Sequence, residues 1–260
     1  MNLKNKCIAA MLLLFSSGVI AQSTISSPYS RFGYGVLTEN VLSQGQGLGY
    51  AGIGLRTGNH LNFINPASFS AIDSSHFLFE VGLSSRFNYF SLNGEKTNNS
   101  NTSMDYLAAG FPITRWWGMG VTLMPFSKIG YSYVEDGLLP DSSKTTSYYI
   151  GTGGFNKVVI GQSFNVCKQL SVGLNSAFIF GEAEFSSINN VASDAFFDPT
   201  TKYSWYNVHG FNFEAGLQYT LPVGKEKSMV FGVLYAPKQK LNYTKTALTT
   251  TSSSSDTVEY

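Results

Sequence analysis

The sequence has little charge, few cysteines and, beyond its first residues, no long apolar run. Only 13% of its 260 residues are charged, whereas a typical soluble domain has about 25%. The net charge of +1 gives no basic surface of the kind that binds nucleic acid. After the N-terminal segment no apolar run reaches the roughly 18 residues of a transmembrane helix. This composition argues against an ordinary soluble domain and against nucleic acid as a partner.

Metal ligands and disulfide partners are also scarce. The histidines, His60, His76 and His209, share no short spacing with one another or with a cysteine, so we predict no metal site. Cys7 lies in the N-terminal apolar stretch, which leaves Cys167 without an intramolecular partner. An Asp-Ser-Ser-His run ends at His76, but four neighbours in a loop do not make a catalytic site. We therefore expect neither a cofactor nor enzymatic activity.

The N-terminus has the features of a cleaved export signal. Lys4 and Lys6 precede an apolar stretch at 7–20, and Ala21 supplies a small residue at the expected cleavage site. The apolar stretch is too short for a membrane-spanning helix. We therefore predict that residues 1–21 are a signal peptide and that the protein is exported.

Long amphipathic strand patterns fill the chain from Phe77 onwards. Between Trp205 and Tyr219 one face is apolar with aromatic ends, while the alternate positions are mostly small or polar. Some of these patterns run for about 15 residues, whereas strands in soluble proteins average about 5–6. The last residues, Asp256 to Tyr260, resemble the start of an eighth strand. Seven full patterns precede them, at 77–92, 103–113, 117–134, 147–166, 170–186, 203–220 and 228–246.

The connections between these strands alternate in length. Short periplasmic turns and long external loops are typical of outer-membrane β-barrels. The sequence therefore predicts an all-β fold, a transmembrane antiparallel β-barrel that contacts lipid in the outer membrane of a Gram-negative cell. The short connections lie at 114–116, 167–169 and 221–227, and the longer ones, rich in polar residues, at 93–102, 135–146 and 187–202.

The segment 22–76 precedes the predicted strands and shows no long alternation. It carries a motif of the G-x-G-x-x-G type and then an Asn-Pro-Ala tripeptide, which are formed by Gly47, Gly49, Gly52, Asn65, Pro66 and Ala67. This order of motifs, between an export signal and barrel strands, is similar to the N-terminal hatch of the FadL family of outer-membrane transporters. The opening residues 27–35 resemble Bacteroidetes-type members of that family.

The resemblance implies a 14-stranded barrel plugged by a hatch at 22–76. The strands at 77–260 would then form about half of the barrel, so the chain is expected to be a fragment. The implied function is passive transport of hydrophobic compounds such as long-chain fatty acids, with a lateral exit at a kinked strand. Pro125, which cannot donate to a sheet ladder, marks this kink. The alternative is a barrel that does not transport but serves as an accessory or scaffold of a type IX-like secretion system, with secretion-system proteins as partners.

The glycine motif also matches the dinucleotide-binding fingerprint. That fingerprint requires a preceding strand, a following helix and an acidic residue about 20 positions later, and no βαβ pattern surrounds these glycines. We expect the glycines to permit tight turns and close backbone approach within the barrel.

Charged and bulky side chains on the inward face of the strands are the candidate binding residues: Arg86, Met124, Phe126, Lys128 and Glu214. Arg86 and Lys128 could bind the carboxylate of a hydrophobic ligand, and Met124 and Phe126 could line its path. Alternatively, the charges form salt bridges inside the barrel, and the two apolar side chains pack against the hatch.

Overall fold

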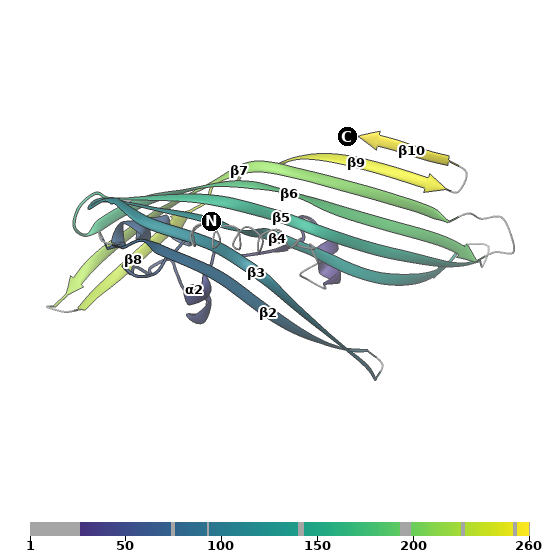
Figure 1. Ribbon diagram of the computed structural model, residues 1–260, viewed down its shortest axis with the longest axis horizontal. Helices are drawn as coiled ribbons and strands as arrows, with labels where there is room; N and C mark the ends of the chain where they lie inside the picture. Colours follow the sequence, from purple (N-terminus) through teal and green to yellow (C-terminus); the bar gives the residue numbers. More distant parts are fainter. Residues whose placement is uncertain are drawn as a thin grey trace, which may run out of the picture.

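A single curled antiparallel sheet forms most of the molecule. The computed structural model describes residues 27–73, 76–92, 94–139, 143–192, 199–224, 227–251 and 254–259, so the predicted signal peptide lies outside the described residues. The strand order is β10-β9-β7-β6-β5-β4-β3-β2, with β1 beside β4 and β8 beside β7. The sheet curves into a half-barrel (Figure 1). No helix in the described ranges has the length and apolarity needed to cross a membrane.

The predicted all-β, antiparallel fold is confirmed, and the strands are longer than expected. The longest, β7, has 24 residues. A membrane-spanning strand needs only about 9–11. The strands of the main sheet are β2 Leu78–Leu92, β3 Glu95–Thr114, β4 Trp117–Leu138, β5 Lys144–Asn165, β6 Leu170–Ala192, β7 Thr200–Val223, β8 Lys227–Tyr235, β9 Asn242–Thr251 and β10 Ser254–Glu259.

Strand pairing extends into segments that the sequence predicts as long loops. The segment 93–102 is almost entirely strand, because β3 begins at Glu95, which pairs with Leu92 of β2. The Asn- and Ser-rich composition suggests a loop, but polar side chains also pair across strands, as Ser85 and Thr102 do with a 2.8 Å hydrogen bond. The predicted connections at 135–146 and 187–202 are likewise shortened from both ends.

The predicted strand at 228–246 is interrupted. β8 and β9 pair with different halves of β7, and residues 236–241 between them are not strand. Pro237 lies in this interval and cannot donate a ladder hydrogen bond. The side chain of Gln239 accepts from the backbone N–H of Phe213 at 3.2 Å and donates to the backbone carbonyl of Phe213 at 3.3 Å.

The predicted eighth strand is confirmed, since β10 pairs with β9.

The inward and outward faces of β4 exchange at a bulge. The register to β5 shifts between Pro125 and Ser127, and the burial alternation changes phase there. An unbroken alternation from Trp117 onwards predicts that Ile129 and Tyr131 point to the lipid face. They are instead turned to the concave face, where Ile129 is 1% exposed, because one extra residue in a strand reverses every later side chain.

Sheet pairing between β3 and β4 also ends near this bulge. Their last pair is Leu107 with Leu123. Beyond it, the free edge of β4 pairs with β1, Val36–Leu37. The β2–β3 hairpin diverges from the rest of the sheet (Figure 1).

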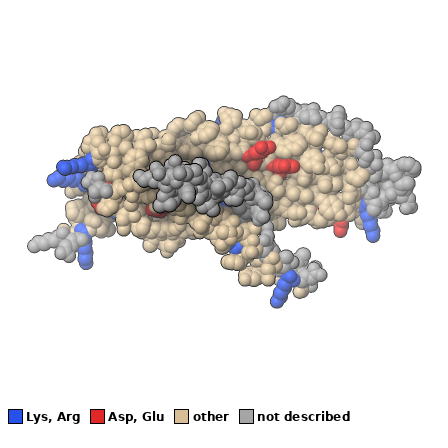
Figure 2. All heavy atoms as spheres, viewed as in Figure 1, with Lys and Arg blue, Asp and Glu red and all other residues tan. Residues whose placement is uncertain are grey.

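The convex face carries an apolar belt of limited height. On β6 it runs from Leu170 to Phe180, with Leu174 45% exposed, and it ends before the exposed Glu182. This span of about 11 residues matches the length of a membrane-spanning strand. Most of the surface visible in Figure 2 is uncharged, and most basic side chains in that view lie toward the ends of the molecule.

Residues 27–73, which we call the seated segment, pack against the concave face of the sheet. Its elements are η1 Pro28–Arg31, β1, α2 Ser43–Gly47 and η2 Pro66–Ala71. The seated segment contributes Leu42, Leu61, Phe63, Phe69 and Ile72 to a core cluster completed by side chains of β3 to β6. These contacts place the seated segment, which precedes the long strands, against the sheet.

Candidate functional site

A row of glycines lines the part of the concave face on which η2 lies. A Cβ added to Gly173 would lie 2.4 Å from the backbone N of Ala67, and one added to Gly216 would lie 2.1 Å from Oδ1 of Asn65. Real Cβ atoms essentially never approach other atoms this closely. Glycine is thus required for close backbone approach. Five further glycines on the neighbouring strands face the seated segment at less than 3 Å: Gly110, Gly118, Gly120, Gly161 and Gly232.

The Asn-Pro-Ala tripeptide is at the centre of this contact. Asn65 is fully buried and caps η2, because its Oδ1 accepts from the N–H of Ala67 at 3.1 Å. Its Nδ2 donates to the carbonyl of Ile53 at 2.8 Å and to that of Leu217 in β7 at 3.2 Å. Pro66 occupies the first turn of η2, where its missing N–H does no harm. The tripeptide therefore both starts the helical turn and joins it to the sheet.

The three motif glycines have different environments. Gly52 is buried, and a Cβ there would lie 2.1 Å from the side chain of Ile64. Gly47 and Gly49 are exposed with nothing near their Cβ positions, although Gly49 has a φ of +70° that favours glycine. Only Gly52 contributes to the packing, and the motif does not act as a unit.

Arg56 is the main polar anchor of the seated segment, and no sequence pattern pointed to it. Its guanidinium donates to the carbonyl of Ala67 at 2.8 Å, to Ser171 Oγ at 2.9 Å and to Asn165 Oδ1 at 3.0 Å. A longer contact of 3.3 Å reaches Gln218 Oε1. Burial lowers the pKa of Arg56 from its ordinary value. One side chain thus links η2 to the β5–β6 turn region and to β7.

Glu214 faces inward as predicted and lies in a polar cluster. Nδ2 of Asn40 lies 3.2 Å from both carboxylate oxygens of Glu214, and Oδ1 of Asn40 accepts from the ammonium of Lys157. Asn175 donates to Glu214 at 3.3 Å and to the carbonyl of Phe63 at 2.9 Å. The carboxylate therefore has partners within the protein, which favours the alternative of internal pairing over ligand binding.

Arg86, Met124 and Lys128 come together around one cavity of about 290 Å³. Lys128 already has an acidic partner, since its Nζ lies 3.4 Å from Oδ1 of Asp105. Met124 is 4% exposed and belongs to the core cluster under the seated segment. These contacts favour the structural alternatives for Lys128 and Met124.

Phe126 and Pro125 lie where β4 bulges. The ring of Phe126 contacts the ring of Tyr34 edge-on at 6.4 Å, and Nζ of Lys157 lies 5.5 Å from its centre. Phe126 thus packs against the seated segment, as the alternative interpretation expected. Pro125 stands at the register shift, close to the end of β3–β4 pairing, and a role in releasing a ligand stays a prediction.

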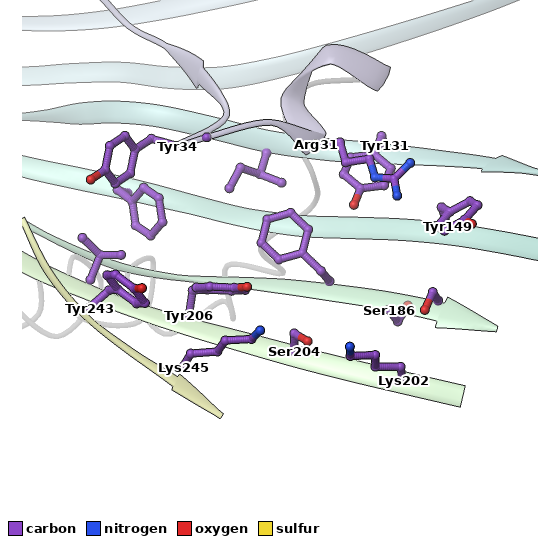
Figure 3. Close-up of a pocket in the computed structure, with 16 residues that line it drawn as sticks. Arg31, Tyr34, Tyr131, Tyr149, Ser186, Lys202, Ser204, Tyr206, Tyr243 and Lys245 are labelled. Carbon is purple, nitrogen blue, oxygen red and sulfur yellow. The ribbon is translucent and has the colours of Figure 1, made fainter. Parts of the chain in front are cut away.

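A second cavity, of about 660 Å³, opens on the concave face beyond η2. The described residues of its walls are rich in tyrosine and include three cations and no acidic side chain. The aromatic and charged ones are Tyr34, Tyr131, Tyr149, Phe155, Phe185, Tyr206, Tyr243, Arg31, Lys202 and Lys245 (Figure 3). Sequence reasoning missed this site because it did not foresee the bulge in β4, which turns the side chain of Tyr131 to the concave face.

Among the described residues, no group of three His, Cys, Asp or Glu side chains could hold a metal ion.

The comparison with protein-family models decides the family. The model of the BamG family matches residues 3–260. The chain belongs to the BamG family. Membership implies association with the outer membrane. No curated protein and no solved structure is significantly similar to the chain.

This family assignment corrects the resemblance drawn from the motifs. BamG is a different family from the FadL-like transporters, so the FadL assignment is wrong. The motifs misled because only Gly52 of the three glycines is packed, and Asn-Pro at the start of a helical turn is a common local signal. The 14-strand count and the hatch came from the same resemblance and are not confirmed.

Proposed function

We propose that this protein is an accessory scaffold subunit of outer-membrane protein assembly. Its membership of the BamG family is the observation that carries this proposal. It agrees with the accessory alternative of the sequence analysis better than with fatty-acid transport, and the partners would be other outer-membrane assembly proteins. The proposed role involves binding and no covalent chemistry.

The packing of the seated segment supports a scaffold. A gated transporter needs a plug that moves, whereas here Arg56 and Asn65 tie the segment to three strands by hydrogen bonds. Gly173 and Gly216 bring backbone and side chain too close for easy sliding. We propose that residues 27–73 act as a fixed plug that keeps the concave face in one shape.

The outer surface supports insertion into the membrane. Phe178 and Phe211 lie side by side on the convex face, with ring centres 5.1 Å apart, and both are at least one-third exposed. Exposed apolar belts of this kind are costly in water and favourable in lipid. We propose that the sheet forms part of a barrel wall.

The proposal is tested by depleting the protein from its host. We expect newly made outer-membrane barrels to accumulate unfolded, which is measured as loss of the heat-modifiable form of a reporter barrel on gels. Uptake of a labelled long-chain fatty acid is measured in the same cells. Normal reporter folding together with lost uptake would overturn the assembly role.

A further inference from the structure

We propose that the 660 Å³ cavity binds an anionic saccharide, a sugar that carries a phosphate or carboxylate group. A scaffold role requires no ligand, so this inference goes beyond the proposed function. The cavity lies between η1, β4 to β7 and β9 (Figure 3). Its size is within the range of about 300–1,000 Å³ that is typical of small-ligand sites.

The charge that the described residues bring to the cavity is positive. Arg31 comes from η1, Lys202 from β7 and Lys245 from β9, and none of the described lining residues is Asp or Glu. Within the described ranges none of these three cations forms an ion pair. Cations gathered in a concave site focus a field that attracts anions. The structure therefore favours an anionic ligand.

Two of these cations are held over tyrosine rings. The guanidinium carbon of Arg31 lies 4.5 Å from the ring centre of Tyr149, and Nζ of Lys245 lies 5.5 Å from that of Tyr206. Arg31 also donates to the hydroxyl of Tyr133. These contacts restrain the cations before any ligand arrives, which lowers the entropy lost on binding.

The aromatic wall continues across the strands. Phe185 meets Tyr206 edge-on at 5.5 Å, and Tyr206 meets Tyr243 at 6.1 Å. Tyrosine offers an apolar ring face and a hydroxyl that forms hydrogen bonds. Ser186 and Ser204 add further hydroxyls to the lining. The wall thus alternates apolar faces with polar groups.

This combination fits a sugar better than an alkyl chain. An alkyl chain would remove the ammonium groups of Lys202 and Lys245 and the hydroxyl of Ser204 from water without replacing their hydrogen bonds. A sugar has apolar ring faces and many hydroxyls, and an attached phosphate or carboxylate pairs with the cations. An anionic saccharide therefore satisfies both kinds of wall.

The position of the cavity indicates two sources for such a ligand. On β6 the cavity is lined at 185–187, beyond the apolar belt, which ends at Phe180. The same holds on β7, where the lining residues at 202–208 precede the exposed Phe211. The cavity thus lies at or beyond the level of lipid headgroups. The saccharide would belong either to a glycolipid headgroup or to a free soluble sugar.

Calorimetric titration of the full chain in detergent micelles tests the proposal. We expect glucose 6-phosphate and glucuronate to bind at least tenfold more tightly than glucose or decanoate, and added salt to weaken binding. The double variant Lys202→Gln/Lys245→Gln should lose at least tenfold in affinity. The matched control is Lys168→Gln/Lys238→Gln, which removes two exposed charges that do not line the cavity and should bind as the wild type does.

A second arm identifies the source. Vesicles that contain lipopolysaccharide are compared with vesicles of neutral phospholipid, with folding of each variant verified by heat-modifiable mobility. Tighter binding to the lipopolysaccharide vesicles than to any free anionic sugar supports a headgroup, and the reverse supports a soluble sugar. Equal binding of glucose, preference for decanoate, an unaffected double variant or no binding by the folded protein would each overturn the proposal.

Discussion

The side-chain oxygen of Asn65 occupies the space that a Cβ at position 216 would need. The two would be 2.1 Å apart. Asn65 itself is fixed by its own hydrogen bonds to Ile53, Ala67 and Leu217. The sheet and the seated segment therefore specify each other's sequence, since neither residue can change without a shift in the other.

Gly216→Ala should destabilise the folded protein by about 1–3 kcal/mol, the usual range for overpacking a tight contact. The measurement is denaturant-induced unfolding of the purified protein in micelles. Gly47→Ala is the control, because nothing lies within 4 Å of its Cβ position and it has no positive φ. Equal stability of the two variants would show that the segment is not held against the sheet.

Arg56→Met should loosen the seated segment. The change leaves Asn165, Ser171 and Gln218 without their shared donor, and loss of hydrogen bonds to a charged group costs on the order of 2 kcal/mol. We expect faster cleavage within residues 27–73 by chymotrypsin. Arg115→Met, at an exposed turn, should be cleaved like the wild type, and faster cleavage of both variants would refute a specific role for Arg56.

Leu174→Arg should impair membrane insertion, because a charge on the lipid face near the bilayer centre costs about 2–4 kcal/mol. Leu174 is 45% exposed within the apolar belt. The readout is the amount of heat-modifiable protein in the outer-membrane fraction. Glu182→Arg lies on the same strand and face beyond the belt and should insert normally; equal insertion of both variants would place the belt outside the membrane.

Asn40 and Glu214 should be energetically coupled. Asn40 donates to both oxygens of the carboxylate, so Asn40→Ala and Glu214→Gln disturb the same cluster. A double-mutant cycle of unfolding free energies should give a coupling of about 1 kcal/mol. Fully additive effects would mean that the contact contributes no stability.

The sequence predicted the features that depend on periodicity. Alternation between Trp205 and Tyr219 correctly assigns the two faces of β7, because side-chain direction in an unbroken strand follows from position alone. The inward position of Glu214 followed from the same count. The region before Phe77 was recognised because it lacks this period.

Features that depend on tertiary contacts could not be predicted in this way. The bulge at Pro125 reverses the phase of β4, and no local signal states on which side of the proline the extra residue lies. Arg56 is a single basic residue in a polar segment, and its role arises only where distant strands meet it. The family assignment needed comparison over the whole chain, since short glycine motifs are shared by unrelated folds.

For the proposed membrane-inserted sheet, the length of β7 sets how far the protein extends above the bilayer. On the cavity side, the excess is the nine residues from Thr200 to Val208, which precede His209, the partner of Phe180 at the end of the apolar belt. At about 3.3 Å per residue, this excess amounts to about 30 Å of strand. Because neighbouring strands pair along much of this excess, it forms a rigid extension of the sheet and not a set of mobile loops. Large molecules that approach the membrane from the side of the cavity would contact this extension, and the cavity within it, before they reach the lipid.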